Sequence, residues 1–460
     1  MSLIHRYQSN GYNIVLDINS GCIHLVDLVT YEVLPFMEEG LSEQEIVDKL
    51  KDQYPEADIR TSVSECEKLK EQGMLFTRDA YENVIEEFTK NRQTVVKALC
   101  LHVAHDCNLR CKYCFASTGD FGQGRKIMPP EIAKKAIDFV IARSGVRHNI
   151  EVDFFGGEPL MAWDTVTQTV DYARSLEEKY NKKFRFTITT NGLLLDDKRK
   201  YINENMDNCV LSLDGRREVN DEFRKTVAGT GSYDTIVPKF KALVDERDPN
   251  LDYYARGTFT SHNLDFAEDV LSIADAGFDR LSVEPVTADP GCGYDLTEDD
   301  LPKIEAEYDR LTDIMLERKK EGKPFTFFHF MVDLDQGPCV VKRLRGCGAG
   351  YEYVAVTPDG DIYPCHQFVG KDEFKQGSVL DQSFNMDIAQ TFAGMNIYSR
   401  PKCQKCWAKF YCSGGCSAAN YNMNHDMNDS YDLGCEMERK RLECAIYLKA
   451  MDKICANQSK

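Results

Sequence analysis

The chain has 460 residues and a net charge of −19, from 56 basic and 75 acidic side chains. A negative field of this size repels nucleic acid, so we expect no nucleic-acid partner. The first residues show no signal-peptide pattern and the apolar runs are too short to span a membrane, which predicts a cytoplasmic protein without membrane segments. In that compartment, 18 cysteines favour metal or redox chemistry over a disulfide framework.

Residues 1–76 are predicted to form a separate unit. The stretches YNIVLDI, CIHLVDL and YEVLPFM have the pattern of short strands, with turns at residues 19–21 and near Thr30. LSEQEIVDKLKDQY predicts a helix with Ser42 and Glu45 as its capping box, and a second helix is expected over residues 58–72. Together they indicate a winged-helix-like module, joined to the next domain by a linker helix within residues 77–95.

Residues 96–335 alternate between strand-like runs and stretches of helix length. The runs are VKALCLHVA, IEVDFFGG, FRFTITTNG, CVLSLDG, YYARGTF and LSVEPV. The segment PPEIAKKAIDFVIARS between the first two has an apolar face of Ile132, Ala136, Ile137, Val140 and Ile141. This alternation predicts an α/β fold with a parallel sheet. Six units are too few for a closed eight-unit barrel, so we expect a partial, TIM-like (β/α)6 barrel with its site at the carboxyl ends of the strands.

Residues 336–460 form the last predicted domain, in which helix periodicity fades and cysteines return. YEYVAVTPDGDIYPC predicts a hairpin whose turn is formed by Pro358, Asp359 and Gly360. The tail from Asp432 to Ile454 is predicted to be helical.

Three cysteines, Cys107, Cys111 and Cys114, lie within eight residues after the first predicted barrel strand. Three thiolates at this spacing fit one corner of a four-iron cluster, and the fourth iron is then open to a substrate or cofactor. A zinc site completed by His102 or His105 is the alternative that the spacing leaves open.

The segment CNLRCKYC, with the aromatic Tyr113 before its last cysteine, resembles the radical S-adenosylmethionine (SAM) enzymes. GGEP closes the second strand and resembles the family segment that holds the methionine amino group, where glycines let backbone carbonyls approach the ligand. TTNG ends the third strand and SLDG the fourth, and NDEFRK follows. By this resemblance the expected SAM contacts are Tyr113, Gly156, Gly157, Glu158, Pro159, Asn191, Ser212 and Arg224.

The resemblance assigns roles to two of these side chains. Ser212 resembles a ribose or carboxylate contact, and Arg224 is expected to pair with the SAM carboxylate. The resemblance also implies that a reduced cluster cleaves SAM and that the resulting 5′-deoxyadenosyl radical takes a hydrogen atom from an unactivated carbon. No catalytic acid or base beyond the clusters stands out.

A second set of cysteines resembles the seven-cysteine SPASM extension of these enzymes, which holds two auxiliary four-iron clusters. The resemblance gives one cluster the ligands Cys403, Cys406, Cys412 and Cys435, and the other Cys347, Cys365 and Cys416. Either Cys339 completes the second set, or one iron is open and binds a substrate thiol as thiolate. A zinc ribbon would use four of these cysteines and leave three unexplained. Three [4Fe–4S] clusters and SAM are therefore the expected cofactors.

SPASM proteins similar to this chain modify peptides, and the order of strands and helices in residues 1–76 resembles elements that bind leader peptides as an added strand. A structural cap on the barrel is the alternative. Over nearly the whole chain, the resemblance extends to SCIFF-type maturases, which form thioethers (sactipeptide or ranthipeptide links) in cysteine-rich precursor peptides. This implies a link from a cysteine sulfur to a carbon of an acceptor residue such as threonine, with a flavodoxin- or ferredoxin-type electron donor.

Three other activities compete with that prediction. Two are SPASM peptide modifiers: a carbon–carbon cross-linker, and a dehydrogenase like the sulfatase maturases, which oxidises cysteine or serine. The third is a non-catalytic iron–sulfur or zinc scaffold, which would leave the SAM-site motifs between Gly156 and Arg224 without a role.

Overall fold

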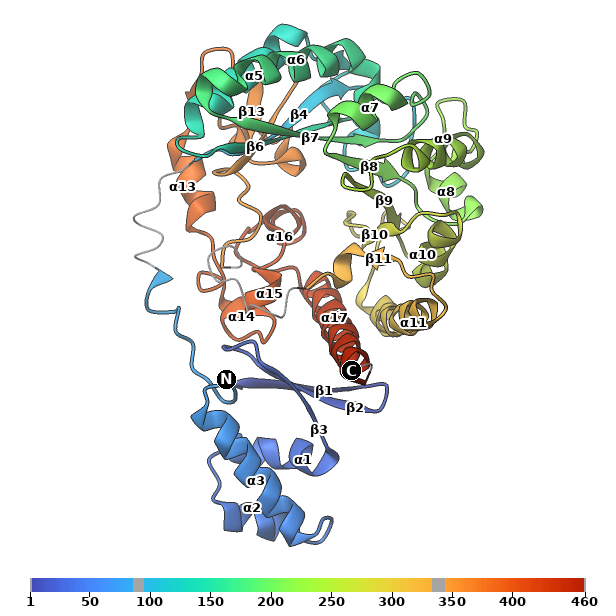
Figure 1. The fold of residues 1–460 in the computed structure, drawn as a ribbon. Coiled ribbons are helices and arrows are strands. Elements are labelled where there is room, and N and C mark those ends of the chain that lie inside the picture. The colour runs from blue at the N-terminus through green and yellow to red at the C-terminus, as the bar shows by residue number, and fades with distance from the viewer. Residues whose placement is uncertain (1, 86–94, 333–343, 459–460) are drawn as a thin grey trace. The chain divides into compact units, whose positions relative to one another are not determined.

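The computed structural model describes residues 2–85, 95–332 and 344–458 (Figure 1). They belong to two compact units, one of residues 1–91, 329–346 and 395–460, and one of residues 92–328 and 347–394. The segment from 347 to 394 therefore belongs to the same unit as the predicted barrel. The segment from 395 to 460 belongs with the N-terminal residues.

The first unit contains three strands and seven helices among its described residues. They are β1 (Ile4–Ser9), β2 (Tyr12–Asp17), β3 (Ile23–Val26), α1 (Leu28–Glu38), α2 (Glu43–Leu50), α3 (Glu56–Glu71), α14 (Pro401–Gln404), α15 (Lys409–Cys412), α16 (Ser417–Asn424) and α17 (Asp432–Gln458). The predicted helical tail is thus confirmed by α17.

The N-terminal prediction was wrong for one strand. YEVLPFM, residues 31–37, lies inside α1, and the turn expected near Thr30 is the first turn of that helix. Asp27 starts the helix, because its carboxylate accepts a hydrogen bond from the backbone N–H of Thr30 at 2.8 Å. The missing strand is β1, which pairs with β2 in an antiparallel sheet of order β1-β2-β3. The winged-helix-like assignment stays a prediction.

The other N-terminal helices agree with the sequence. α2 begins at the predicted capping box, in which Ser42 and Glu45 satisfy each other's backbone N–H groups. Val33, Ile46, Val47, Ile59 and Val63 form a buried core between α1, α2 and α3. The predicted linker helix is wrong for residues 77–84, which form loop and turn, and residues 86–94 of that prediction lie outside the described residues.

The second unit is built on one mixed sheet. Its strands are β4 (Ala98–His105), β5 (Lys126–Ile127), β6 (Asn149–Gly156), β7 (Lys183–Thr190), β8 (Asn208–Ser212), β9 (Asp252–Phe259), β10 (Arg280–Pro285), β11 (Thr326–Phe327), β12 (Tyr353–Val356), β13 (Asp361–Tyr363), β14 (Gly377–Ser378) and β15 (Ser383–Phe384). Its helices are α5 (Pro130–Arg143), α6 (Trp163–Tyr180), α7 (Arg199–Asn205), α8 (Arg217–Phe223), α9 (Tyr233–Asp245), α10 (Phe266–Asp275), α11 (Leu301–Lys320) and α13 (Met386–Gly394).

The six predicted barrel strands are confirmed. They are β4, β6, β7, β8, β9 and β10, each parallel to the next, and they form a partial barrel. The structure adds β11 beside β10, and β12 beside β4, both parallel. Side chains alternate along β7, where Phe184, Phe186 and Ile188 are fully buried between more exposed neighbours. These residues form the core under α5 and α6, which cover the sheet in Figure 1.

The predicted hairpin is confirmed as β12 and β13, which pair antiparallel around the turn at Pro358, Asp359 and Gly360. Because β12 also pairs with β4, this hairpin extends the barrel sheet. None of the described helices is long and apolar enough to cross a membrane.

Candidate functional site

A cavity of about 230 Å³ lies at the carboxyl ends of the parallel strands in the second unit. It is lined by the three-cysteine loop after β4, by the ends of β6, β7 and β8, and by residues of β9 and β10. Of the expected SAM-site residues, the lining includes Cys107, Cys111, Cys114, Tyr113, Gly156, Gly157, Glu158, Asn191, Ser212 and Arg224. Pro159 is buried at the start of the short helix η2 (Pro159–Ala162) and is not among the lining residues.

Burial and mutual repulsion keep the three loop thiols protonated in the absence of a metal. Burial raises the pKa of Cys107 to about 12 and that of Cys111 to about 11, and it also raises the pKa of Cys114. A metal that draws off these protons gains three thiolate ligands from one loop. The donor set fits an iron–sulfur cluster held by three thiolates.

The two histidines of the zinc alternative point elsewhere. His102 and His105 are buried on β4, with the Nδ1 of His102 lying 3.1 Å from the Nε2 of His105. Both rings pack against Phe121, and neither histidine lines the cavity. The geometry therefore does not favour a zinc site completed by either histidine.

The GGEP glycines are required by chain packing. A Cβ at Gly156 would overlap the carbonyl oxygen of Ala104, and one at Gly157 would overlap that of Asp106. Gly156 also has a φ of +128°, which L side chains rarely adopt. The contacts that exclude a side chain are thus with β4 and the start of the cysteine loop. The expectation that these glycines also let a ligand approach the backbone closely stays a prediction.

Glu158 ties the end of β6 to the end of β7. Its buried carboxylate accepts hydrogen bonds from the Leu160 N–H at 3.0 Å, the Thr190 hydroxyl at 2.8 Å and the Asn191 N–H at 2.8 Å. The Asn191 side chain in turn donates to Asn108 in the cysteine loop at 2.8 Å. Glu158 therefore holds the strand ends together through its side chain, and its backbone N–H donates to the carbonyl oxygen of Asp106 at 2.9 Å.

Arg224 and Tyr113 share a partner that the sequence analysis did not select. Asp214, fully buried in SLDG, accepts hydrogen bonds from the Tyr113 hydroxyl at 2.8 and 2.6 Å. The Nε of Arg224 lies 3.1 Å from the same carboxylate. The motif placed Asp214 beside Ser212, but only the strand order brings Tyr113 and Arg224 to it.

Other lining residues also escaped prediction. Arg256 on β9 and Glu284 on β10 form an ion pair, with Nε donating to Oε1 at 3.0 Å. Both residues alternate with buried residues in strands that were predicted from the sequence, and this alternation was the signal that could have identified them. His366, in η5 (His366–Phe368), lies with its ring centroid 5.4 Å from that of Phe115 and 5.1 Å from that of Phe155. Its position next to Cys365 gave no indication that it would reach the cavity.

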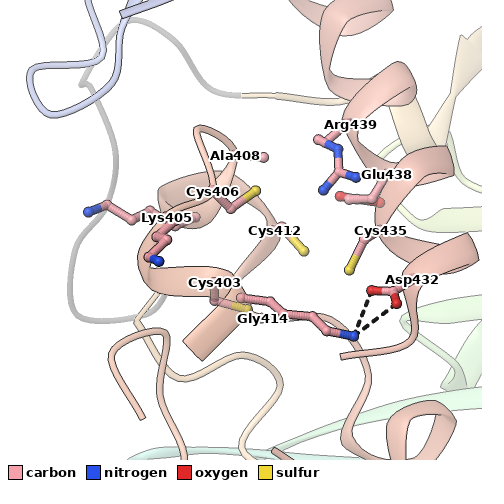
Figure 2. A pocket seen from close by; sticks show the side chains of 12 residues that line it. Cys403, Lys405, Cys406, Ala408, Cys412, Gly414, Asp432, Cys435, Glu438 and Arg439 are labelled. Carbon is pink, nitrogen blue, oxygen red and sulfur yellow. Dashed lines mark hydrogen bonds and ion pairs between the residues drawn. The ribbon is translucent and has the colours of Figure 1, made fainter. Parts of the chain in front are cut away.

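A second cavity, of about 320 Å³, lies in the first unit (Figure 2). Its lining includes all four cysteines expected to hold one auxiliary cluster: Cys403, Cys406, Cys412 and Cys435. Figure 2 shows the thiols of Cys406, Cys412 and Cys435 directed toward the same space, the first two from the segment of α14 and α15 and the third from α17. Burial raises the pKa of Cys435 to about 11 and also raises that of Cys412. Four thiols around one cavity fit a cubane.

The remaining auxiliary ligands are divided between the units. Cys347 and Cys365 belong to the second unit and Cys416, at the start of α16, to the first. The assignment of these three to one cluster stays a prediction. Cys339, the candidate for a fourth ligand, lies outside the described residues.

Comparison with known proteins agrees with both cavities. The family model described as "Radical SAM superfamily" matches residues 101–249, and that of the SPASM "Iron-sulfur cluster-binding domain" matches residues 347–407. The cysteine-type anaerobic sulfatase-maturating enzyme of Clostridium novyi is 25% identical over 72% of this chain and 90% of its own length.

Two solved structures share the fold. Native anSMEcpe with bound AdoMet and Kp18Cys peptide aligns with a TM-score of 0.63 and 20% identity, covering 77% of this chain and 98% of its own. Streptococcus suis SuiB bound to precursor peptide SuiA aligns with a TM-score of 0.53 and 17% identity, covering 94% of this chain and 98% of its own. The two matched domains and the thiol-lined cavities together support a radical SAM enzyme that carries a SPASM domain.

Proposed function

We propose that this enzyme forms a thioether in a ribosomally made, cysteine-rich precursor peptide, between a cysteine sulfur and a carbon of an acceptor residue such as threonine. The observation that carries the proposal is the presence, in one chain, of a strand-end cavity lined by three thiols and of an N-terminal sheet whose edge strand β3 pairs with only one other described strand. The matched proteins include a sulfatase-maturating enzyme and SuiB, which was solved with a precursor peptide, and this supports a peptide substrate.

The edge strand β3 suits a leader peptide. Among the described strands, β3 pairs only with β2, so its outer edge has backbone groups available to an added strand. A hollow of about 460 Å³ beside it is lined by β3, α1 and α3, with Leu34, Leu69 and Leu75 among its apolar residues. Leu25 on β3 is 38% exposed. An extended leader with an aliphatic side chain fits this edge.

The residues of the barrel cavity would hold the cofactors as follows. Cys107, Cys111 and Cys114 hold the SAM-binding cluster, Ser212 contacts the ribose or carboxylate, and Arg224 pairs with the SAM carboxylate. The Phe115, Phe155 and His366 side chains pack together in the cavity lining and would give a substrate an aromatic contact surface. When bound, the cluster and SAM supply a one-electron cleavage that takes one hydrogen atom from the substrate.

The proposed reaction balances as an oxidation of the peptide by two electrons. One C–H and one S–H bond break and one C–S bond forms. The hydrogen atom ends in 5′-deoxyadenosine, the thiol proton goes to solvent, and the remaining electron passes to an auxiliary cluster and on to an external acceptor. A flavodoxin- or ferredoxin-type protein supplies the electron that cleaves SAM.

The test begins with anaerobic reconstitution and an assay of SAM cleavage with dithionite. About twelve irons per chain are expected for three cubanes. The enzyme is then incubated with a small cysteine-rich peptide, chosen from reading frames beside its gene, and the product is treated with iodoacetamide. A thioether gives a product lighter by two hydrogens, with its sulfur retained and one fewer alkylated thiol for each link. Loss of two hydrogens with every thiol still alkylated indicates a carbon–carbon link or, if the product reacts with a hydrazine, a serine dehydrogenase. Loss of sulfur indicates a cysteine dehydrogenase.

The leader site is tested separately with Leu25→Asp, which places a charge at the edge of β3. We expect the KM for the peptide to rise while SAM cleavage without peptide is unchanged. Val227→Asp is the matched control, because Val227 is 63% exposed in the second unit. An unchanged KM in Leu25→Asp would contradict leader binding at β3.

A further inference from the structure

We propose that Asp214 is a positioning residue of the SAM site, which fixes Arg224 and Tyr113 in the orientation that receives SAM. This inference rests on the proposed function, because it takes Arg224 as the partner of the SAM carboxylate. Asp214 itself acts through the other two side chains and is not assigned a contact with SAM.

Three separate segments meet at the Asp214 carboxylate. The Tyr113 hydroxyl, from the cysteine loop, donates to both oxygens at 2.8 and 2.6 Å. The backbone N–H of Thr258, on β9, donates to Oδ1 at 3.2 Å. The Nε of Arg224, which follows α8, lies 3.1 Å from Oδ1. One fully buried carboxylate thus links the cluster loop, the sheet and the cationic side chain.

The guanidinium of Arg224 contacts Asp214, and Arg224 also lines the cavity. Its side chain is 11% exposed, and Asp214 occupies the Nε edge. Its Nη1 lies 4.0 Å from the sulfur of Cys111, and its guanidinium carbon lies 5.7 Å above the ring of Tyr113. Arg224 also lines the cavity, so we infer that the N–H groups not directed at Asp214 or Cys111 receive a ligand. A guanidinium held along one edge presents its remaining N–H groups in a fixed direction, which suits a carboxylate ligand.

The charges around the Arg224 guanidinium explain why a carboxylate is needed at position 214. Arg224 is a buried cation beside three thiols that become thiolates when the cluster is bound, and an unrestrained guanidinium would be drawn toward their negative charge. The Asp214 carboxylate opposes that attraction, because it lies 3.1 Å from the Nε of Arg224. Without that charge, the guanidinium is drawn closer to Cys111, whose sulfur already lies 4.0 Å from Nη1.

A purely structural role would have different consequences. Tyr113 lies between Cys111 and Cys114, so Asp214 also anchors the cluster loop. If anchoring were its whole role, Asp214→Asn would lower the iron content or stability and would act independently of Arg224. If Asp214 positions Arg224, the effect falls on SAM binding and disappears when Arg224 is already altered.

The test uses the full chain, reconstituted with iron and sulfide, in the variants Asp214→Asn, Arg224→Gln and the double variant. Iron is counted first. The Kd for SAM is then measured anaerobically by isothermal titration calorimetry without a reductant, so that SAM binds but is not cleaved. We expect Asp214→Asn to keep its iron and to raise the Kd by about 10- to 100-fold, the range for loss of a charge-assisted contact. The double variant should bind SAM no more weakly than Arg224→Gln alone.

Asp153→Asn is the matched control. Asp153 lies on β6 of the same sheet, and burial raises its pKa to about 7. Its amide variant should bind SAM with the wild-type Kd. A Kd for Asp214→Asn within about twofold of wild type, a loss of cluster iron, or effects that add in the double variant would each overturn the proposal.

Tyr113→Phe provides a second route if Asp214→Asn does not fold, since it keeps the ring that lines the cavity and removes the hydroxyl that donates to the carboxylate. The Kd should then rise by about 3- to 10-fold with unchanged iron, and a wild-type Kd would again overturn the proposal. Failure of the proposed function is separate from these outcomes: it would appear as absent SAM cleavage or an unmodified peptide in the wild-type enzyme.

Discussion

The stability of the barrel unit should depend on pH through Glu158, and Glu158→Gln removes that dependence. Burial raises the pKa of the Glu158 carboxyl from 4.5 to about 7, against the lowering effect of its three hydrogen-bond donors. The folded protein therefore binds this proton more tightly than the unfolded chain. Its contribution to stability is fully present below about pH 4.5 and is lost as the pH rises through about 7.

The magnitude follows from the shift. A difference of 2.5 between the two pKa values of Glu158, at about 1.4 kcal/mol for each unit, gives a contribution of about 3 kcal/mol. Glutamine has the same shape but does not titrate, so the variant loses this term at every pH. Its amide oxygen can accept from only one of the Leu160 and Asn191 N–H groups, and the other then faces the amide NH2, which adds a constant cost of about 1–3 kcal/mol.

The assay is anaerobic urea unfolding of wild type and Glu158→Gln from about pH 6 to about pH 8.5. The free energy of unfolding of the wild type should exceed that of the variant most at the acid end, and the difference should shrink toward alkaline pH. Glu131→Gln is the control, because Glu131 is exposed in the first turn of α5. A difference that grows with pH would refute the reasoning, since it would mean that the hydrogen bonds outweigh burial and lower the pKa.

Three further predictions concern the cysteine sites and the N-terminal unit. Gly157→Ala should lose the barrel cluster, seen as about four fewer irons per chain, because its Cβ overlaps the Asp106 carbonyl next to the cysteine loop. Cys412→Ala should lose about four irons from the second cavity but still cleave SAM with dithionite, and loss of SAM cleavage would contradict separate sites. Asp17→Ala should lower the unfolding free energy of the N-terminal unit, measured in urea, by about 2 kcal/mol, because the buried carboxylate accepts a hydrogen bond from the Thr77 N–H at 3.0 Å. Asp48→Ala, at an exposed position, should change it by less than about 0.5 kcal/mol.

The sequence predicted the barrel well because several of its strands alternate between buried and more exposed residues. Runs such as FRFTITT carry this two-residue alternation and end in recognisable turns, so both element type and order could be assigned. YEVLPFM shows the limit of that reasoning. It is a short, mostly apolar run, but the Asp27 cap and the burial of Val33 and Leu34 against α3 decide for a helix, and packing of that kind is not visible in a short window.

The site residues that could be predicted are those in motifs with a recognisable spacing along the chain. The cysteines of the loop and of the second cavity follow from separations along the chain, and they line the two cavities as expected. Asp214, Arg256 and His366 were missed for a different reason. Tyr113 and Asp214 are 101 residues apart, and only the parallel order β7-β8-β9 beside the cysteine loop makes them neighbours.

The place of His366 bears on how electrons could leave the substrate. β12 pairs with β4, and the hairpin returns through β13 directly to Cys365, a predicted auxiliary-cluster ligand. The next residue, His366, lines the barrel cavity beside Phe155. A predicted ligand of an auxiliary cluster and the wall of the substrate cavity are therefore adjacent within one compact unit. This adjacency does not depend on where the first unit lies, and it supports the proposal that an auxiliary cluster accepts the electron left after the C–S bond forms.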